Sequence, residues 1–271
     1  MPNITERFNQ EGRSLERGKN CVLTISFLRH ANKTDIDPHK DGAISNTSLS
    51  EKGKINSQEK GKDWNFSKLV KQKTSEMSRA EETADNINLG ANDREDFELL
   101  KSRVDKSLNP AHFSPAFIEQ YRNHFKKLPA NYSDLSETEQ EKLIEDAEAP
   151  AVEYWLQLGD NKFDDETETA IDVAKRVAGT LVHYDRMIEK LKDNTEAEMM
   201  NITHRTVIEP ILMYCLKPTI KNLAEIGGPI NLLEDFVLKI ISDDNGEKQR
   251  KLTFRGKEWE LDWDKIQELV N

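Results

Sequence analysis

The stretch CVLTISFLRHANK, residues 21–33, joins an apolar run to an abrupt charged and polar end. Its first eight residues are nearly all apolar and several are β-branched, which is the pattern of a strand buried on both faces. Arg29 and His30 follow at once, and a cation and an imidazole are poorly suited to an apolar core. Open α/β sheets bind ligands just beyond the carboxyl ends of their strands. The sequence therefore predicts a functional site around Arg29 and His30.

A second strand with the same kind of ending occurs far along the chain. Residues 199–203 form a short apolar run, His204 ends it, and residues 206–216 have the apolar character of a buried helix. A single histidine at the end of a strand is more often structural than functional. Two such histidines, one of them directly after an arginine, favour a shared site.

The composition limits the classes of function. The chain has 271 residues, enough for one large α/β core or two small ones. Its 39 basic and 50 acidic residues give a net charge of −11, which argues against non-specific binding to nucleic acid or to anionic lipid. No apolar run is long enough to span a membrane, and the first twenty residues contain no apolar segment of a secretory signal. We therefore expect a cytoplasmic protein.

Cysteine and histidine spacing points away from metal chemistry. Cys21 and Cys215 both lie in apolar stretches, as reduced core cysteines do. The six histidines show no metal-ligand spacing, and the chain has no Cys-x-x-Cys motif. We expect neither a metal nor another cofactor.

Between the two strands, one arginine stands out. A weak strand pattern at residues 69–73 precedes a predicted helix over residues 75–88, with Ser75 as its N-cap. Arg79 falls in the first turn of this helix, where backbone N–H groups favour an anion. Taken alone, a solvated arginine on a charged helix is the simpler interpretation.

The middle of the chain predicts a helical insertion. Residues 105–164 contain three prolines, many aromatic residues and acidic runs such as SETEQEKLIEDAE. We interpret them as a cap lying over the sheet, whose aromatic residues form its own small core rather than a ligand cage. The predicted organisation is a single domain over residues 1–271, with a core over residues 20–104 and 165–271 and a polar arm over residues 1–19.

The C-terminal part completes the predicted elements. Apolar residues recur at helical spacing in residues 166–192. Residues 236–241 and 251–254 are predicted to form a hairpin, and residues 263–270 a final helix.

Five short pieces of this sequence together resemble the histidine phosphatase superfamily, also called phosphoglycerate mutase-like. LRHA resembles the Arg-His-Gly signature of the family, and ITHRTVIEPIL resembles its Ser-His-Gly motif. The other three pieces are LSEKGKINSQEKGK (residues 49–62), TSEMSRAEETA (residues 74–84) and ETAIDVAKRV (residues 168–177). Each match is weak, but all five occur in the order of the family, over about residues 21–216.

The resemblance implies a fold and a chemistry. The implied fold is an α/β three-layer sandwich, with a mainly parallel central sheet, helices on both faces and a helical cap insertion. The implied activity is metal-independent hydrolysis of a phosphorylated small molecule. His30 would be the nucleophile that becomes phosphohistidine, and Arg29, Arg79 and a protonated His204 would surround the phosphate. Asn32 would add a neutral donor, although a turn residue is an equally good interpretation.

The sequence departs from the family in three places. Ala31 replaces the glycine after the first histidine, and Arg205 replaces the glycine after the second. Residues 93–104 contain another strand candidate, the third along the chain. The glutamate that often donates the proton in the family is missing from the loop after it, where Asp105 is the available carboxylate. Asp105 is therefore the predicted general acid, and Glu168 its substitute at the phosphate site. The alternatives are a turn residue for Asp105 and a helix N-terminal acid for Glu168.

Two other functions stay open beside the phosphatase. A phosphoglycerate mutase-like phosphotransferase would return the phosphoryl group to a product. A catalytically weakened phosphate-binding module would keep the basic residues and lack efficient proton donation. A nucleotide-binding Rossmann protein is disfavoured, because no G-x-G-x-x-G follows any predicted strand. The sequence identifies neither the substrate nor the oligomeric state.

Overall fold

The computed structural model describes residues 17–34, 47–129 and 131–271. Most of the predicted arm over residues 1–19, and most of the polar loop between the first strand and the next helix, lie outside these ranges. The strands are β1 (Val22–Arg29), β2 (Leu69–Thr74), β3 (Glu98–Val104), β4 (Glu196–Thr203), β5 (Leu216–Lys217), β6 (Asp235–Ser242), β7 (Lys248–Phe254) and β8 (Lys257–Leu261). The α-helices are α2 (Glu51–Asp63), α3 (Ser78–Gly90), α4 (Pro115–Phe125), α5 (Glu137–Leu158), α6 (Ala170–Met187), α7 (Arg205–Cys215) and α8 (Trp263–Val270).

The eight strands form one mixed sheet in the order β3-β2-β4-β1-β6-β7-β8-β5. Strands β3, β2, β4 and β1 run parallel to one another, and the strands from β6 onward pair antiparallel. In the pairing of β1 with β4, Arg29 lies opposite Thr203. His30 and His204 are the next residues in each strand, so both leave the sheet at the same edge.

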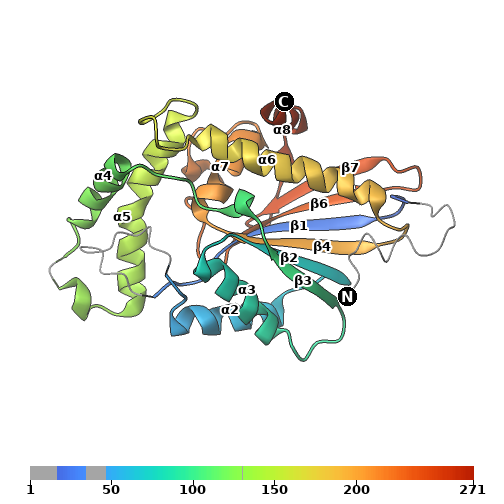
Figure 1. Cartoon of the computed structure of the whole chain (residues 1–271), viewed down its shortest axis with the longest axis horizontal. Helices are drawn as coiled ribbons and strands as arrows, with labels where there is room; N and C mark the ends of the chain where they lie inside the picture. Colours follow the sequence, from blue (N-terminus) through green and yellow to red (C-terminus); the bar gives the residue numbers. More distant parts are fainter. Residues whose placement is uncertain (1–16, 35–46, 130) are drawn as a thin grey trace.

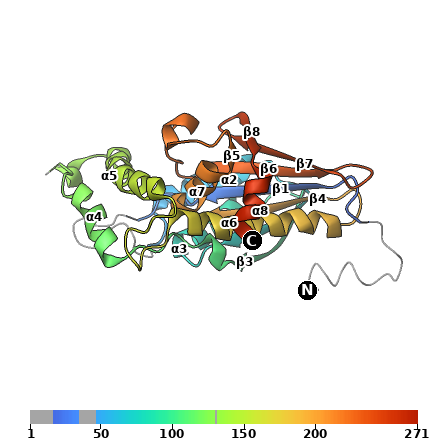
Figure 2. The ribbon, with the colours of Figure 1, turned by 90° about the horizontal axis from the view of Figure 1, so that it is seen from above.

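Helices cover both faces of the sheet (Figures 1 and 2), which confirms the predicted three-layer α/β fold. Leu23, Ile25 and Phe27 of β1 are fully buried in the larger core, together with residues of α6, α7 and α8. Leu28 belongs to the second core, which includes Ala80 and other residues of α3. The opening apolar run is therefore buried on both faces, as its composition predicts.

Helices α4 and α5 come from the predicted insertion and lie beyond the end of the sheet (Figure 1). Their aromatic residues pack on one another, as expected. The rings of Phe113 and Phe117 stack with centroids 4.5 Å apart, and Phe113 meets Trp155 edge-on at 5.4 Å. These rings belong to the larger core, which also includes residues of β1, α6 and α7, so the predicted separate core of the insertion was wrong.

Two local predictions differ from the structure. Helix α3 begins at Ser78 with Met77 as its N-cap, and no side chain caps it. The predicted N-cap Ser75 was wrong, because its hydroxyl is hydrogen-bonded to His204 instead. The C-terminal hairpin is confirmed, but it is extended by β8, whose alternating charged residues concealed a strand.

Cys21 and Cys215 are buried, as expected, and neither forms a disulfide. Within residues 17–34, 47–129 and 131–271, no helix combines the length and the apolar character needed to cross a bilayer.

Candidate active site

Two buried histidines form the centre of a cavity at the carboxyl edge of the parallel strands. His30 follows β1, and His204 is the N-cap residue of α7. Only 6% of His30 and 3% of His204 is exposed, and their ring centroids lie 5.0 Å apart. The backbone N–H of His30 donates to the carbonyl oxygen of Thr203, at 2.9 Å, which fixes the two strand ends side by side.

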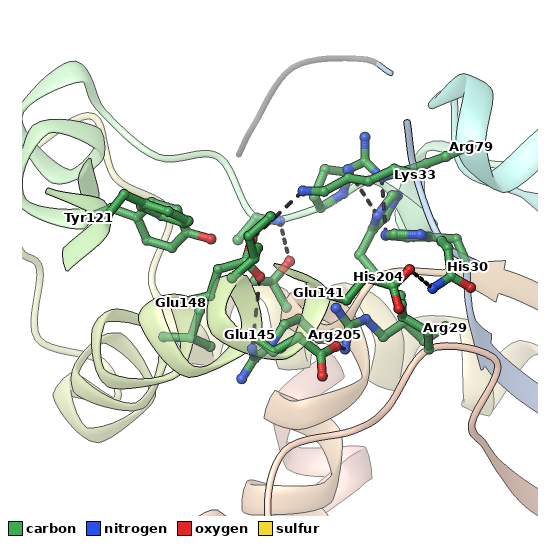
Figure 3. A pocket seen from close by; sticks show the side chains of 18 of the residues that line it. Arg29, His30, Lys33, Arg79, Tyr121, Glu141, Glu145, Glu148, His204 and Arg205 are labelled. Carbon is green, nitrogen blue, oxygen red and sulfur yellow. Dashed lines mark hydrogen bonds and ion pairs between the residues drawn. The ribbon is translucent and has the colours of Figure 1, made fainter. Parts of the chain in front are cut away.

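Arg79 connects the two rings (Figure 3). Its Nε donates to Nε2 of His30 at 3.1 Å, and its second terminal nitrogen donates to Nδ1 of His204 at 3.2 Å. Arg79 lies in the first turn of α3 and is buried. The structure therefore places it in the site, whereas the sequence alone favoured a solvated arginine.

The hydrogen bonds assign a proton to each imidazole. Nδ1 of His30 lies 2.7 Å from the carbonyl oxygen of Ala31, which can only accept, so Nδ1 carries the proton. Nε2 of His30 then keeps its lone pair, in agreement with the bond from Arg79. In His204, Nδ1 accepts from Arg79, so Nε2 carries the proton and donates to the hydroxyl of Ser75 at 2.8 Å.

Burial and the nearby cations determine the charge of these groups. Burial, together with the charges of Arg79 and Arg29, lowers the pKa of both histidines well below 6.5. Both rings are therefore neutral at neutral pH. In the ligand-free site, desolvation and two guanidiniums oppose a third cation on His204, whereas the predicted protonated His204 concerns the phosphate-bound site and stays a prediction. Burial also lowers the pKa of Arg79 to about 10, which leaves it charged at neutral pH.

Arg29 lines the same cavity and retains an unused donor. One of its terminal nitrogens donates to the carbonyl oxygen of Ile230, at 2.6 Å, and to Oε1 of Glu145, at 2.8 Å. Its Nε–H is buried and has no acceptor among the described residues. An unpaired buried donor is costly unless a ligand satisfies it.

Asn32 also lines the cavity. Its side-chain amide donates to Glu141 and accepts from the amide of Asn56 at 3.2 Å. Its backbone carbonyl accepts from the N–H of Ser50 at 3.0 Å, which joins the segment after β1 to the start of α2.

The two predicted acids lie away from this cavity. Asp105 forms an ion pair with Lys73 at 2.8 Å, and it accepts from the backbone N–H of Ser107 as the N-cap of a short 3₁₀ helix. Lys73 and Ser107 hold the pKa of Asp105 below its usual value despite partial burial. Glu168 pairs with Arg176 at 3.0 Å. Neither carboxylate is among the residues that line the cavity.

Three glutamates of α5 face the cavity instead, and the sequence analysis missed them. Glu141, Glu145 and Glu148 are spaced i, i+4 and i+7, which places them on one face of the helix. Figure 3 shows them between Tyr121 and the two histidines. Their helical spacing indicates a common face, but the three glutamates lie within an acidic run, and such runs are typical of a solvated surface.

Glu148 is the most buried of the three. Lys33 lies 3.7 Å from one of its oxygens, and Arg205 lies 4.0 Å from the other. Burial alone would raise the pKa of Glu148, but Lys33, Arg205 and Arg29 together hold it below its usual value. Arg205, which replaces the family's glycine, also pairs with the buried Glu209 at 3.2 Å. Its charge is therefore balanced by two carboxylates.

The rest of the cavity wall is largely apolar. Phe113, Tyr121, Phe125, Tyr132 and Ile144 line it together with the charged groups. The aromatic residues of the insertion thus belong to the larger core, rather than to a small one of their own, and also form part of the cavity wall. Within the described part of the chain, no group of three histidine, cysteine or acidic residues is arranged to hold a metal ion.

Comparisons with known proteins identify the fold. No protein-family model and no curated protein matches the sequence. Among solved structures, YhfR of Bacillus stearothermophilus aligns with a TM-score of 0.52 at 17% identity, over 87% of this chain and 97% of its own. Phosphoglycerate mutase from Bacillus anthracis aligns with a TM-score of 0.50 at 16% identity, over 94% and 99% of the two chains. A mycobacterial glucosyl-3-phosphoglycerate phosphatase aligns with a TM-score of 0.50 at 17% identity, over 89% and 97%. The chain therefore has the fold of the histidine phosphatase superfamily.

Proposed function

We propose that this protein hydrolyses phosphomonoesters of small molecules through a phosphohistidine on His30. The observation that carries the proposal is a neutral His30, with a lone pair on Nε2, beside two guanidiniums in one cavity. A neutral imidazole is a competent nucleophile toward phosphorus. Solved structures of the same fold include a phosphatase and a mutase, which supports phosphoryl transfer as the reaction class.

The reaction has two steps in this proposal. Nε2 of His30 attacks phosphorus, the bond from phosphorus to the ester oxygen breaks, and the alcohol leaves with an added proton. Water then attacks the phosphohistidine, which releases inorganic phosphate and restores the imidazole. Arg29 and Arg79 donate to the phosphoryl oxygens, where charge and positioning supply most of the catalysis.

His204 has an accessory role in the same proposal. The cationic surroundings that lower its pKa are offset when a phosphate dianion binds between Arg29 and Arg79. The bound phosphate thus favours a positively charged His204, which adds a donor to the phosphoryl group.

The test is hydrolysis of p-nitrophenyl phosphate by the wild type and by His30→Ala. We expect turnover that disappears in the variant, and acid-labile phosphate on the wild type after rapid quenching. His183→Ala is the matched control, because His183 is exposed on α6 and does not line the cavity. No turnover by a wild type whose melting temperature rises with vanadate would instead identify a phosphate-binding module. Transfer to added alcohol in place of phosphate release would identify a phosphotransferase.

A further inference from the structure

The proposed first step needs a proton at a particular place. An alkyl ester releases a strongly basic alkoxide unless an acid protonates the oxygen as the bond to phosphorus breaks. The acid must lie within hydrogen-bond reach of that oxygen, which leaves from the side of phosphorus opposite to the attacking nitrogen. With His30 at the edge of the sheet, the acid has to come from across the cavity. Asp105 and Glu168 do not line this cavity.

Helix α5 crosses the cavity on that side and supplies three carboxylates (Figure 3). Glu148 is buried against Lys33 and Arg205, and both cations stabilise its ionised form. It also accepts a hydrogen bond from Tyr121. A carboxylate held ionised in this way is a poor proton donor. Glu141 pairs with Lys52 at 2.7 Å through one oxygen and accepts from Asn32 through the other, so both of its oxygens already have donors.

Glu145 differs from both neighbours in its partner. It pairs with Arg29, one of the two guanidiniums that would hold the phosphate, at 2.8 Å. Arg29 keeps its buried Nε–H free of any acceptor among the described residues. The same guanidinium can therefore hold Glu145 and a phosphoryl oxygen together, which places the carboxyl group beside the reacting ester.

Phosphate binding also changes the surroundings of Glu145. A phosphate dianion on Arg29 competes with the carboxylate for the guanidinium and repels the carboxylate directly. With 34% of its side chain exposed, Glu145 can exchange a proton with solvent.

From this geometry we infer that Glu145 of α5 is the general acid that protonates the leaving alcohol. The inference rests on the hydrolase proposed above. As the bond between phosphorus and the ester oxygen breaks, Glu145 transfers its proton to that oxygen and becomes a carboxylate. In the second step the carboxylate accepts a proton from the attacking water, which restores the acid and yields phosphate.

The test compares two leaving groups. Dinitrophenolate is a weak base and departs without a proton. The alkoxide released from glycerol phosphate is strongly basic and needs a proton from an acid as it departs. We expect Glu145→Gln to lower kcat for glycerol phosphate by about 10²- to 10⁴-fold, the usual contribution of a general acid, and to change kcat for dinitrophenyl phosphate only a few-fold. A merely structural role would lower both rates equally.

Asp146→Asn is the matched control, because Asp146 is the exposed neighbour of Glu145 on the same helix. Equal losses on both esters in Glu145→Gln would overturn the inference and leave the hydrolase standing. A leaving-group-dependent loss in Asp105→Asn, with none in Glu145→Gln, would assign the acid to Asp105 instead. A wild type without His30-dependent turnover of dinitrophenyl phosphate would overturn both proposals.

Discussion

The substitution Gly53→Ala, which adds one methyl group, tests whether close packing of the start of α2 positions the segment after His30. A Cβ built on Gly53 lies 2.1 Å from the backbone oxygen of Asn32, whereas real Cβ contacts are essentially never under 3.0 Å. Gly53→Ala therefore requires a displacement of at least 0.9 Å, the difference between these two distances. Because the contacted atom is backbone, either α2 or the Asn32 segment has to move. The same oxygen accepts from the N–H of Ser50, so that hydrogen bond weakens too.

The size of the effect can be isolated with a matched glycine. Gly179 lies inside α6, and a Cβ there meets nothing within 4 Å. Gly179→Ala should stabilise the protein by roughly 0.5–1 kcal/mol, the gain expected in a helix interior. Gly53→Ala has the same helical gain but adds overpacking, which costs about 1–3 kcal/mol. The difference between the two variants thus measures the clash.

Urea denaturation of both variants provides the free energies of unfolding, and hydrolysis of an aryl phosphate provides the activity. We expect Gly53→Ala to be less stable than Gly179→Ala by about 1–3 kcal/mol, which corresponds to roughly 2–4 °C in melting temperature per kcal/mol. Its kcat/KM should fall by up to about 10²-fold, the effect of misplacing a catalytic group by about 1 Å. Equal stability and equal activity in the two variants would refute the reasoning.

Three further predictions concern charge. Arg79→Lys keeps a cation but replaces two separate donor nitrogens, each on one histidine, with a single nitrogen, so kcat/KM for aryl phosphate should fall by about 10²- to 10³-fold. Both histidines have folded pKa values well below 6.5, so the unfolded chain binds protons first as the pH falls. The free energy of unfolding should therefore fall below pH 6.5, by up to about 1.4 kcal/mol per pH unit for each histidine. In urea denaturation at several pH values, His30→Asn should remove the contribution of one histidine to this slope. Glu209→Ala leaves the buried Arg205 with a single carboxylate at 4.0 Å and should cost about 3–5 kcal/mol of stability, measured by urea denaturation.

Each of these changes has a control outside the cavity. Arg186→Lys and His183→Asn alter exposed residues of α6 that do not line the cavity and should leave activity unchanged. Glu258→Ala breaks an exposed ion pair with Lys251 and should affect stability far less than Glu209→Ala. Activity of Arg79→Lys within threefold of wild type would contradict its bridging role. A pH slope that is the same in His30→Asn and wild type would contradict a buried neutral His30.

The local pattern of the sequence was enough to predict much of the sheet. The apolar run before Arg29 and the shorter one before His204 predict parallel buried strands, and the register of β1 with β4 brings their ends together. Arg79 was harder to assign, because its neighbours along α3 are charged and its burial depends on contact with two residues distant in sequence. Local spacing cannot distinguish such an arginine from a solvated one.

The carboxylates that face the cavity could not be predicted from the local sequence pattern. Asp105 was the carboxylate expected from its place after β3, yet it pairs with Lys73 away from the cavity. Glu145 lies in an acidic run that has the composition of a solvated surface. Only the position of α5 across the cavity turns that face toward Arg29.

The sequence by itself determined the two buried strands that end in His30 and His204 and the hairpin of β6 and β7, because these depend on side-chain pattern over a few neighbouring residues. The tertiary structure alone decided which charges meet, how each imidazole is protonated and which carboxylates face the cavity. These properties depend on burial and on distances between groups far apart in the sequence, such as Arg79 and His30 or Arg29 and Glu145, and no local pattern encodes such distances.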